Sequence, residues 1–262
     1  MTSSPHLEQP VLLYPFTTHW RWTSRQAWEE EIRDLAGRLP GLPSDTRVGF
    51  RWRPRPLALT HDRALLRAGL VGVAVDERIP GSVDHWLGDD GPQGLPRIEL
   101  GEGADRGVIA EGRVWVEDPS GAGRLWGADE RRRAAASVRQ SLGPPRAARP
   151  LAFVSGCPSA PLERAYLEWC LEEGAALLLA GDRDLAGPSF VWSRPTVACL
   201  DAERLAGVEA ALRSAAGLRR LRRRFRRLEA ILLPAEPDAA SADRQLWAAL
   251  DVRLVAWPEA VP

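Results

Sequence analysis

Apolar positions form two kinds of pattern along this chain, a helical spacing and a short continuous run. Segments of the two kinds alternate from residue 23 to the end. Residues 23–39 place apolar side chains three and four apart, the spacing of an amphipathic helix, and Thr23 with Gln26 forms a pair typical of a helix start. Residues 70–77 and 175–181 contain short apolar runs of the kind that form buried strands. The pattern therefore predicts helices and buried strands in alternation.

Along the whole chain, the same two patterns predict strands and helices. The strands cover 46–52, 70–77, 113–117, 151–156, 175–181, 194–200, 228–234 and 252–257. The helices cover 23–39, 60–69, 128–142, 160–174, 201–216, 218–228 and 241–251, with a short one near 82–88. Because strands alternate with helices, we expect a largely parallel α/β architecture. Its first lobe is expected at 1–106 and its second at 107–262, closely packed or joined as one domain.

The stretch "VWVEDPSGAGRLWG", residues 114–127, joins a predicted strand to a predicted helix through two glycines. A glycine-rich turn in this position presents backbone N–H groups that can bind phosphate. The turn holds no lysine and no threonine, which leaves a second interpretation open. In that interpretation Gly121 and Gly123 only permit a tight turn and close packing, and they bind nothing.

Composition narrows the chemistry that the chain can perform. All 35 basic residues are arginine and 35 residues are acidic, so the zero net charge gives no global attraction to nucleic acid or an anionic membrane. Without lysine, the chain can form no Schiff base and reaches no phosphate with an ammonium group. No apolar run approaches the roughly 18 residues of a membrane helix. Since the first residues do not resemble a signal peptide, we expect a cytoplasmic protein.

The three cysteines, Cys157, Cys170 and Cys199, do not have the spacing of metal ligands. Cys157 stands in "SGCPS", but all the histidines fall in the first third of the chain, so no pair of nucleophile and base is evident. We therefore expect an inert, buried thiol at Cys157, no metal site and no catalytic residue.

The segment "LRRLRRRFRR", residues 218–227, holds seven arginines in ten positions. It has three interpretations: a solvated helix face, a surface for phosphates or for an acidic carrier protein, and a nucleic-acid surface, which the zero net charge disfavours. An anionic partner would contact Arg219, Arg222, Arg223 and Arg226.

Several segments follow one another in the order found in one enzyme family. The segments "WTSRQAWEEEIRDLAGRL", "LLRAGLVGVAVDE", "EEGAALLLAGD" and "SRPTVACL" have about the spacing of the N-terminal part of the adenylate-forming enzymes. These enzymes include acyl-CoA synthetases, non-ribosomal adenylation domains and luciferases. Over essentially its whole length the chain resembles their N-terminal subdomains. The resemblance implies two α/β lobes with mostly parallel sheets, without the family's β-barrel and C-terminal lid.

The chain departs from the family where the family carries out its chemistry. In the resemblance, Ser120, Gly121 and Gly123 are the remnant of the phosphate loop "TSGTTGxPKG", and Arg124 supplies a positive charge beside them. Trp257 takes the place of a tyrosine that stacks on adenine, with Glu259 as the acid that follows it. Trp257 can also be a packing residue, which is the more common role of a buried indole.

These departures imply a degenerate, truncated homologue that binds a partner without catalysis, since the sequence ends before the family's lid and its lysine. Two alternatives stay open: half of a split ligase completed by a partner chain, and a plain α/β binding module. We expect no adenylation by the chain alone and no required cofactor, with only weak binding of ATP, AMP or CoA. The expected partner is another protein, an acidic carrier protein among the candidates, or a second copy of the chain.

Overall fold

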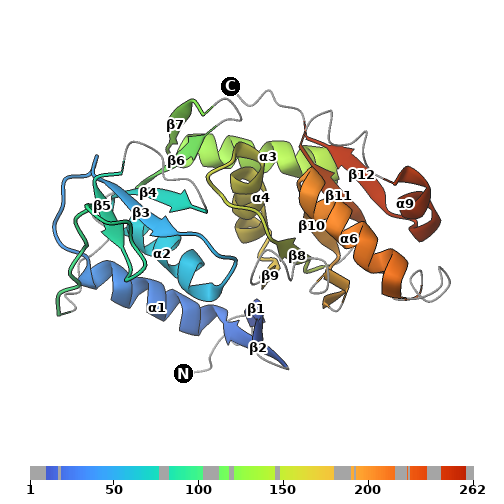
Figure 1. The fold of residues 1–262 in the computed structure, drawn as a ribbon, viewed down its shortest axis with the longest axis horizontal. Helices are drawn as coiled ribbons and strands as arrows, with labels where there is room; N and C mark the ends of the chain where they lie inside the picture. Colours follow the sequence, from blue (N-terminus) through green and yellow to red (C-terminus); the bar gives the residue numbers. More distant parts are fainter. Residues whose placement is uncertain are drawn as a thin grey trace. The chain divides into compact units, whose positions relative to one another are not determined.

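The computed structural model describes residues 10–16, 19–76, 83–102, 112–117, 121–144, 148–179, 190–191, 193–215, 223, 225–234 and 243–257. The described chain forms one sheet of seven strands and one of five, with helices packed against them (Figure 1). Most neighbouring strands run in parallel. The predicted α/β class with mostly parallel sheets is thereby confirmed.

The five-stranded sheet has the order β5-β3-β4-β6-β7, and all its pairings are parallel except that of β6 with β7. Its buried centre consists of valines from β4 and of Trp86. The strands are β3 (Arg47–Arg51), β4 (Val71–Val75), β5 (His85–Leu87), β6 (Arg113–Glu117) and β7 (Gly123–Trp126).

Two helices accompany this sheet, α1 (Arg25–Arg38) and α2 (Pro56–Arg67). The hydroxyl of Ser24 accepts a hydrogen bond from the backbone N–H of Ala27, so the capping residue of α1 is Ser24, one residue after the predicted Thr23. Proline at the first position of α2 fits a helix start because its missing N–H would have no partner there. The indole of Trp28 donates to the hydroxyl of Thr60 at 3.2 Å and so links the two helices.

The seven-stranded sheet has the order β12-β11-β10-β8-β9-β1-β2. Its strands are β1 (Pro10–Phe16), β2 (His19–Ser24), β8 (Leu151–Val154), β9 (Ala176–Leu179), β10 (Val197–Cys199), β11 (Ala230–Leu233) and β12 (Arg253–Ala256). The accompanying helices are α3 (Ala128–Leu142), α4 (Pro161–Glu172), α6 (Ala202–Ala215) and α9 (Arg244–Leu250).

Both faces of the seven-stranded sheet are covered, as a parallel sheet requires. On one face, buried side chains of β8, β10 and β11 form a single apolar cluster with residues of α6 and α9. On the other face, Arg253 donates to the carbonyl of Leu142 at 2.8 Å, and Trp257 donates to the hydroxyl of Ser137 at 2.8 Å. Both acceptors belong to α3, which therefore lies opposite α6 and α9.

Three predictions about local structure were wrong. The segment near 82–88 contains the strand β5 instead of a helix, because it pairs in parallel with β3 and buries Trp86 completely. The strands β1 and β2 were missed, although β1 pairs with β9 inside the sheet. Phe225–Leu228 forms a turn instead of the end of a helix, and the Phe225 ring stacks on Phe190. The rest of the predicted helix falls outside the described residues, apart from Arg223.

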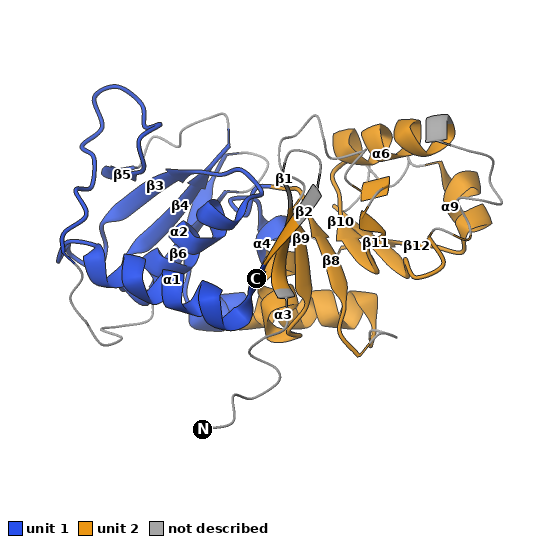
Figure 2. Ribbon diagram, turned by 90° about the horizontal axis from the view of Figure 1, so that it is seen from below, with its two compact units in different colours: residues 1–10, 23–131, 157–164 blue, residues 11–22, 132–156, 165–262 orange. Residues whose placement is uncertain are grey.

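The chain divides into two compact units (Figure 2). The predicted boundary at 106/107 lies outside the described residues and stays a prediction. The described residues of unit 1 fall mainly within 23–131 and 157–164, and those of unit 2 within 11–22, 132–156 and 165–262. The first unit extends to Arg131 because β6 and β7 belong to the five-stranded sheet.

The described residues lack two kinds of feature. No helix there has both the length and the apolar character needed to cross a membrane. The same part of the chain contains no cluster of three or more histidine, cysteine or acidic side chains suited to a metal ion.

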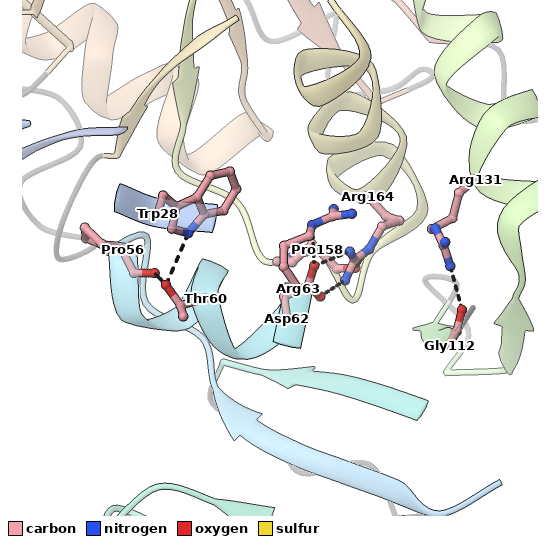
Figure 3. Close-up of polar contacts among 9 residues, drawn as sticks. All are labelled: Trp28, Pro56, Thr60, Asp62, Arg63, Gly112, Arg131, Pro158 and Arg164. Atoms are coloured by element: carbon pink, nitrogen blue, oxygen red, sulfur yellow. Dashed lines mark hydrogen bonds and ion pairs between the residues drawn. The ribbon is translucent and has the colours of Figure 1, made fainter. Parts of the chain in front are cut away.

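A buried ion pair between Asp62 of α2 and Arg164 of α4 joins segments of unit 1 that are 102 residues apart (Figure 3). The guanidinium of Arg164 donates to both carboxylate oxygens of Asp62, at 2.7 and 2.9 Å, and to the carbonyl of Pro158 at 3.1 Å. Both side chains are fully buried, and Arg63 lies 3.2 Å from the same carboxylate. This bidentate contact gives both charged groups hydrogen-bond partners without water.

Burial favours the neutral form of the Asp62 carboxyl and by itself raises its pKa. The positive charges of Arg164 and Arg63 and the hydrogen bonds from Arg164 outweigh burial, so the pKa of Asp62 lies below its ordinary value of 3.8. Asp62 is therefore ionised in the folded protein at neutral pH.

The variant Arg164→Leu leaves the Asp62 carboxylate buried without its main partner. We expect the free energy of unfolding, measured by urea denaturation, to fall by about 3–5 kcal/mol. The double variant Asp62→Leu with Arg164→Leu removes both charges and should recover most of the loss. Arg25→Leu breaks an exposed 3.9 Å pair with Glu29 and should cost less than about 0.5 kcal/mol. If Arg164→Leu and Arg25→Leu lowered the free energy of unfolding equally, the buried pair would contribute no more to stability than the exposed one.

Asp62→Asn should destabilise the protein strongly at pH 7 and progressively less as the pH falls below the unfolded-state pKa of about 3.9. The lowered pKa means that the ionised carboxylate stabilises the fold above the unfolded-state pKa of about 3.9, and that this contribution disappears as the pH falls through the folded-state pKa. Urea denaturation of both proteins at several pH values measures the difference. A constant difference from pH 7 to pH 3 would contradict the assignment.

Candidate functional site

The glycine-rich stretch forms a β-hairpin, and this corrects the predicted order of strand, turn and helix. Strands β6 and β7 pair antiparallel, with Glu117 opposite Gly123 and Trp115 opposite Leu125. A second strand therefore lies between the turn and α3, which begins at Ala128. Of the turn itself, Gly121 and Ala122 are described, and Ser120 lies outside the described residues.

Gly123 is required by the packing of Trp115. A Cβ atom at position 123 would lie 1.9 Å from Cζ2 of Trp115, far inside any van der Waals contact. Trp115 and Gly123 are diagonal neighbours on one face of the hairpin, and an aromatic ring over a glycine of an edge strand is a recurrent way to support such a residue. The indole also donates to Glu117 at 3.2 Å, and the Arg47 guanidinium lies 4.2 Å from the ring centroid.

Gly121 and Arg124 also have local explanations. Gly121 has φ of +84°, a backbone conformation that residues with a side chain rarely adopt, and no atom would meet a Cβ there within 4 Å. Arg124 holds its guanidinium 5.3 Å from the ring centroid of Trp126, whose side chain is fully buried. The geometry thus supports the second interpretation of the stretch, in which both glycines serve the turn and its packing.

Trp257 follows β12 and is 3% exposed, with its indole nitrogen bonded to Ser137. A ring in this position packs against its own unit, as the alternative role predicted, and is closed to a stacking ligand in this conformation. Glu259 lies outside the described residues. It therefore stays a prediction that an adenine site once included Trp257 and Glu259.

The Cys157 thiol is poorly suited to nucleophilic catalysis. Burial raises its pKa to about 12, so almost none of the reactive thiolate is present at neutral pH. Ser159 donates to its sulfur at 3.2 Å. The imidazole of His61 is mostly buried on α2, and burial lowers its pKa to about 4, so it is neutral at pH 7.

The two described residues of the predicted arginine patch, Arg223 and Arg226, are exposed, whereas Arg219 and Arg222 lie outside the described residues. Arg226 lines a cavity of about 510 Å³ in unit 2. Arg227, from the same predicted segment, also lines it. Sequence reasoning missed the other charged residues of this cavity, which are Arg149, Arg194, Glu229 and Asp251.

A signal for this cavity was nevertheless present in the sequence. Arg149, Arg194, Glu229 and Asp251 each come just before or at the start of a predicted strand. Because these strands are parallel, their amino ends meet at one edge of the sheet. Charged residues that precede successive parallel strands can therefore be expected to lie together.

Comparison with known proteins establishes the fold. The sequence matches no protein-family model, and no curated protein matches it either. In structure, the chain is similar to E. coli MenE with a bound OSB-AMS analogue (TM-score 0.69, 14% identity), to IdnL1 (0.69, 20%) and to CmiS6 (0.72, 15%). All three are adenylate-forming enzymes. The predicted resemblance is thus confirmed for the fold.

The similarity is partial in length. It covers 95% of this chain in each case, but 56% of MenE, 57% of IdnL1 and 67% of CmiS6. The chain therefore spans between about half and two thirds of these structures. What it shares with them is the fold of an N-terminal α/β region.

Gly123→Ala should lower the free energy of unfolding by about 1–3 kcal/mol, because the new methyl group must displace the Trp115 ring. On a Trp115→Ala background the same substitution should cost much less, since the ring is gone. Gly207→Ala, on the exposed side of α6 with no atom near its Cβ position, should instead stabilise by about 0.5–1 kcal/mol. Equal effects of the two alanine substitutions would contradict the packing role of Gly123.

Proposed function

We propose that this protein is a non-catalytic homologue of adenylate-forming enzymes that acts as a binding or assembly partner in a biosynthetic system. The observation that carries the proposal is the hairpin of β6 and β7. Trp115 fills the space beside Gly123, and Gly121 has the backbone of a turn glycine. A phosphate loop depends on open backbone N–H groups and nearby cations, and this hairpin has neither lysine nor threonine.

The chemistry of adenylation gives the proposal its physical basis. A carboxylate must approach the α-phosphate of ATP, so an enzyme has to neutralise two anions that meet. Losing one stabilising donor costs on the order of a hundredfold in rate. Here Leu125 and Trp126 stand where the family's loop has proline and lysine, and Arg124 lies over an indole. These substitutions support binding without chemistry.

The partner we propose is a protein, either a second copy of the chain or a component of the same biosynthetic system. Enzymes of this fold activate carboxylates, and their products pass to carrier proteins or to coenzyme A. The split-ligase alternative makes a different prediction, because a partner chain would then restore pyrophosphate release from ATP.

The purified chain should bind ATP with a dissociation constant above about 1 mM, which corresponds to less than about 4 kcal/mol of binding free energy. Isothermal titration with ATP and Mg²⁺ measures the affinity, and a pyrophosphate assay with a panel of carboxylic acids measures the chemistry. The matched control Arg124→Gln should give the same result as the wild type, because Arg124 contacts an indole in the structure.

Two outcomes would contradict the proposed function. One is pyrophosphate release by the chain alone. The other is micromolar ATP binding that Arg124→Gln weakens, which would show that the hairpin holds phosphate. Pyrophosphate release only after a co-purifying protein is added would favour the split ligase.

A further inference from the structure

We infer that the cavity in unit 2 is a binding site for a small phosphate ester that carries hydroxyl groups. The inference is independent of the hairpin, which belongs to the other sheet. The cavity measures about 510 Å³, within the roughly 300–1,000 Å³ of typical small-molecule sites. Its concave form suits a small ligand better than the convex face of another protein.

The cavity is rich in guanidinium groups. Arg149, Arg194, Arg226 and Arg227 line it together with the carboxylates of Glu229 and Asp251, which leaves an excess of two positive charges. Among the described residues, no ion pair or side-chain hydrogen bond engages Arg194, Arg226 or Arg227. Guanidinium groups of this kind suit an anionic ligand. The planar guanidinium can donate two parallel hydrogen bonds to two oxygens of one phosphate.

The backbone around the cavity gives a second, separate observation. Among the described residues, Arg194 (φ 53°) and Asp251 (φ 61°) are the two non-glycine residues with positive φ, and both line this cavity. Each directly follows a helical residue, where glycine is the usual choice because its backbone is unstrained. Residues held in this sparsely populated conformation cluster at active sites and ligand-binding sites.

The remaining lining residues make the site rigid and specific. Leu228 and Leu250, both almost fully buried, contribute apolar walls. Arg149 is held in place, since its Nε donates to the carbonyl of Gly174 at 3.1 Å. The carboxylates of Glu229 and Asp251 repel a second anion but accept hydrogen bonds from hydroxyl groups. Together these features select a phosphate attached to a polyhydroxy compound.

The location of the cavity distinguishes it from the family's nucleotide site. Leu151, Thr196 and Glu229 stand at the amino ends of β8, β10 and β11. Trp257, the candidate adenine-stacking residue, follows the carboxyl end of β12. Ligands of open α/β sheets bind outside the carboxyl ends of the strands, so the fold alone does not account for this site.

Isothermal titration of the full chain with ribose 5-phosphate, with ribose as the uncharged match, tests the inference. Ribose 5-phosphate should bind with a dissociation constant below about 1 mM, and ribose should give no heat at about 10 mM. The affinity for ribose 5-phosphate should fall as salt rises from about 50 to 200 mM.

Arg194→Gly removes one guanidinium and also relieves the left-handed backbone, so the melting temperature should stay equal or rise. Ribose 5-phosphate should nevertheless bind about tenfold more weakly or worse, and Arg227→Gln should have a similar effect. The control Arg33→Gln changes an exposed arginine of α1 in unit 1 and should leave binding unchanged.

Any of three results would overturn the inference: equal responses to ribose and ribose 5-phosphate, no response to either, or binding that survives Arg194→Gly and Arg227→Gln. In the second case, salt-sensitive retention of an acidic protein that the arginine variants abolish would assign the surface to a protein partner. None of these results bears on ATP chemistry at the hairpin, so the two proposals fail separately.

Discussion

The first unit depends on the buried ion pair between Asp62 and Arg164. Neither charge can reach water, so each requires the other, and the pair fixes the short segment that leads into α4. Within that segment, Pro158 accepts a hydrogen bond from Arg164, and the carbonyl of Ser159 accepts one from the N–H of Glu117 at 2.7 Å. The segment that the ion pair positions therefore also contacts Glu117, the last residue of β6.

In the hairpin of β6 and β7, two glycines separated by one residue serve two local purposes. Gly121 supports a turn, and Gly123 lies under an indole. Phosphate binding needs the backbone exposed, whereas packing needs it covered, and the two demands exclude each other at Gly123. In unit 2, four arginines and two carboxylates line a cavity around the amino ends of the parallel strands.

Much of the fold could be predicted from the sequence because its longer elements have strong periods. Helix α3 was predicted with its observed bounds, 128–142, and every predicted strand was found within a few residues. Strand β5, with three residues, has no period of its own and depends on pairing with β3. Strand β1 likewise depends on β9, far along the chain. At the candidate site, the overlap of Trp115 with Gly123 arises from cross-strand register, which a strand–turn–helix prediction could not contain.

The contact between Trp115 and Gly123 also limits how this sequence can change. A threonine or a lysine introduced into the turn would leave Gly123 covered, since the ring of Trp115 would still lie over it. Removing the ring first would expose the edge strand and the valine cluster behind it, at a cost in stability. Opening the backbone at Gly123 therefore requires the loss of the Trp115 ring in addition to any change in the turn, and the first of these changes alone lowers stability.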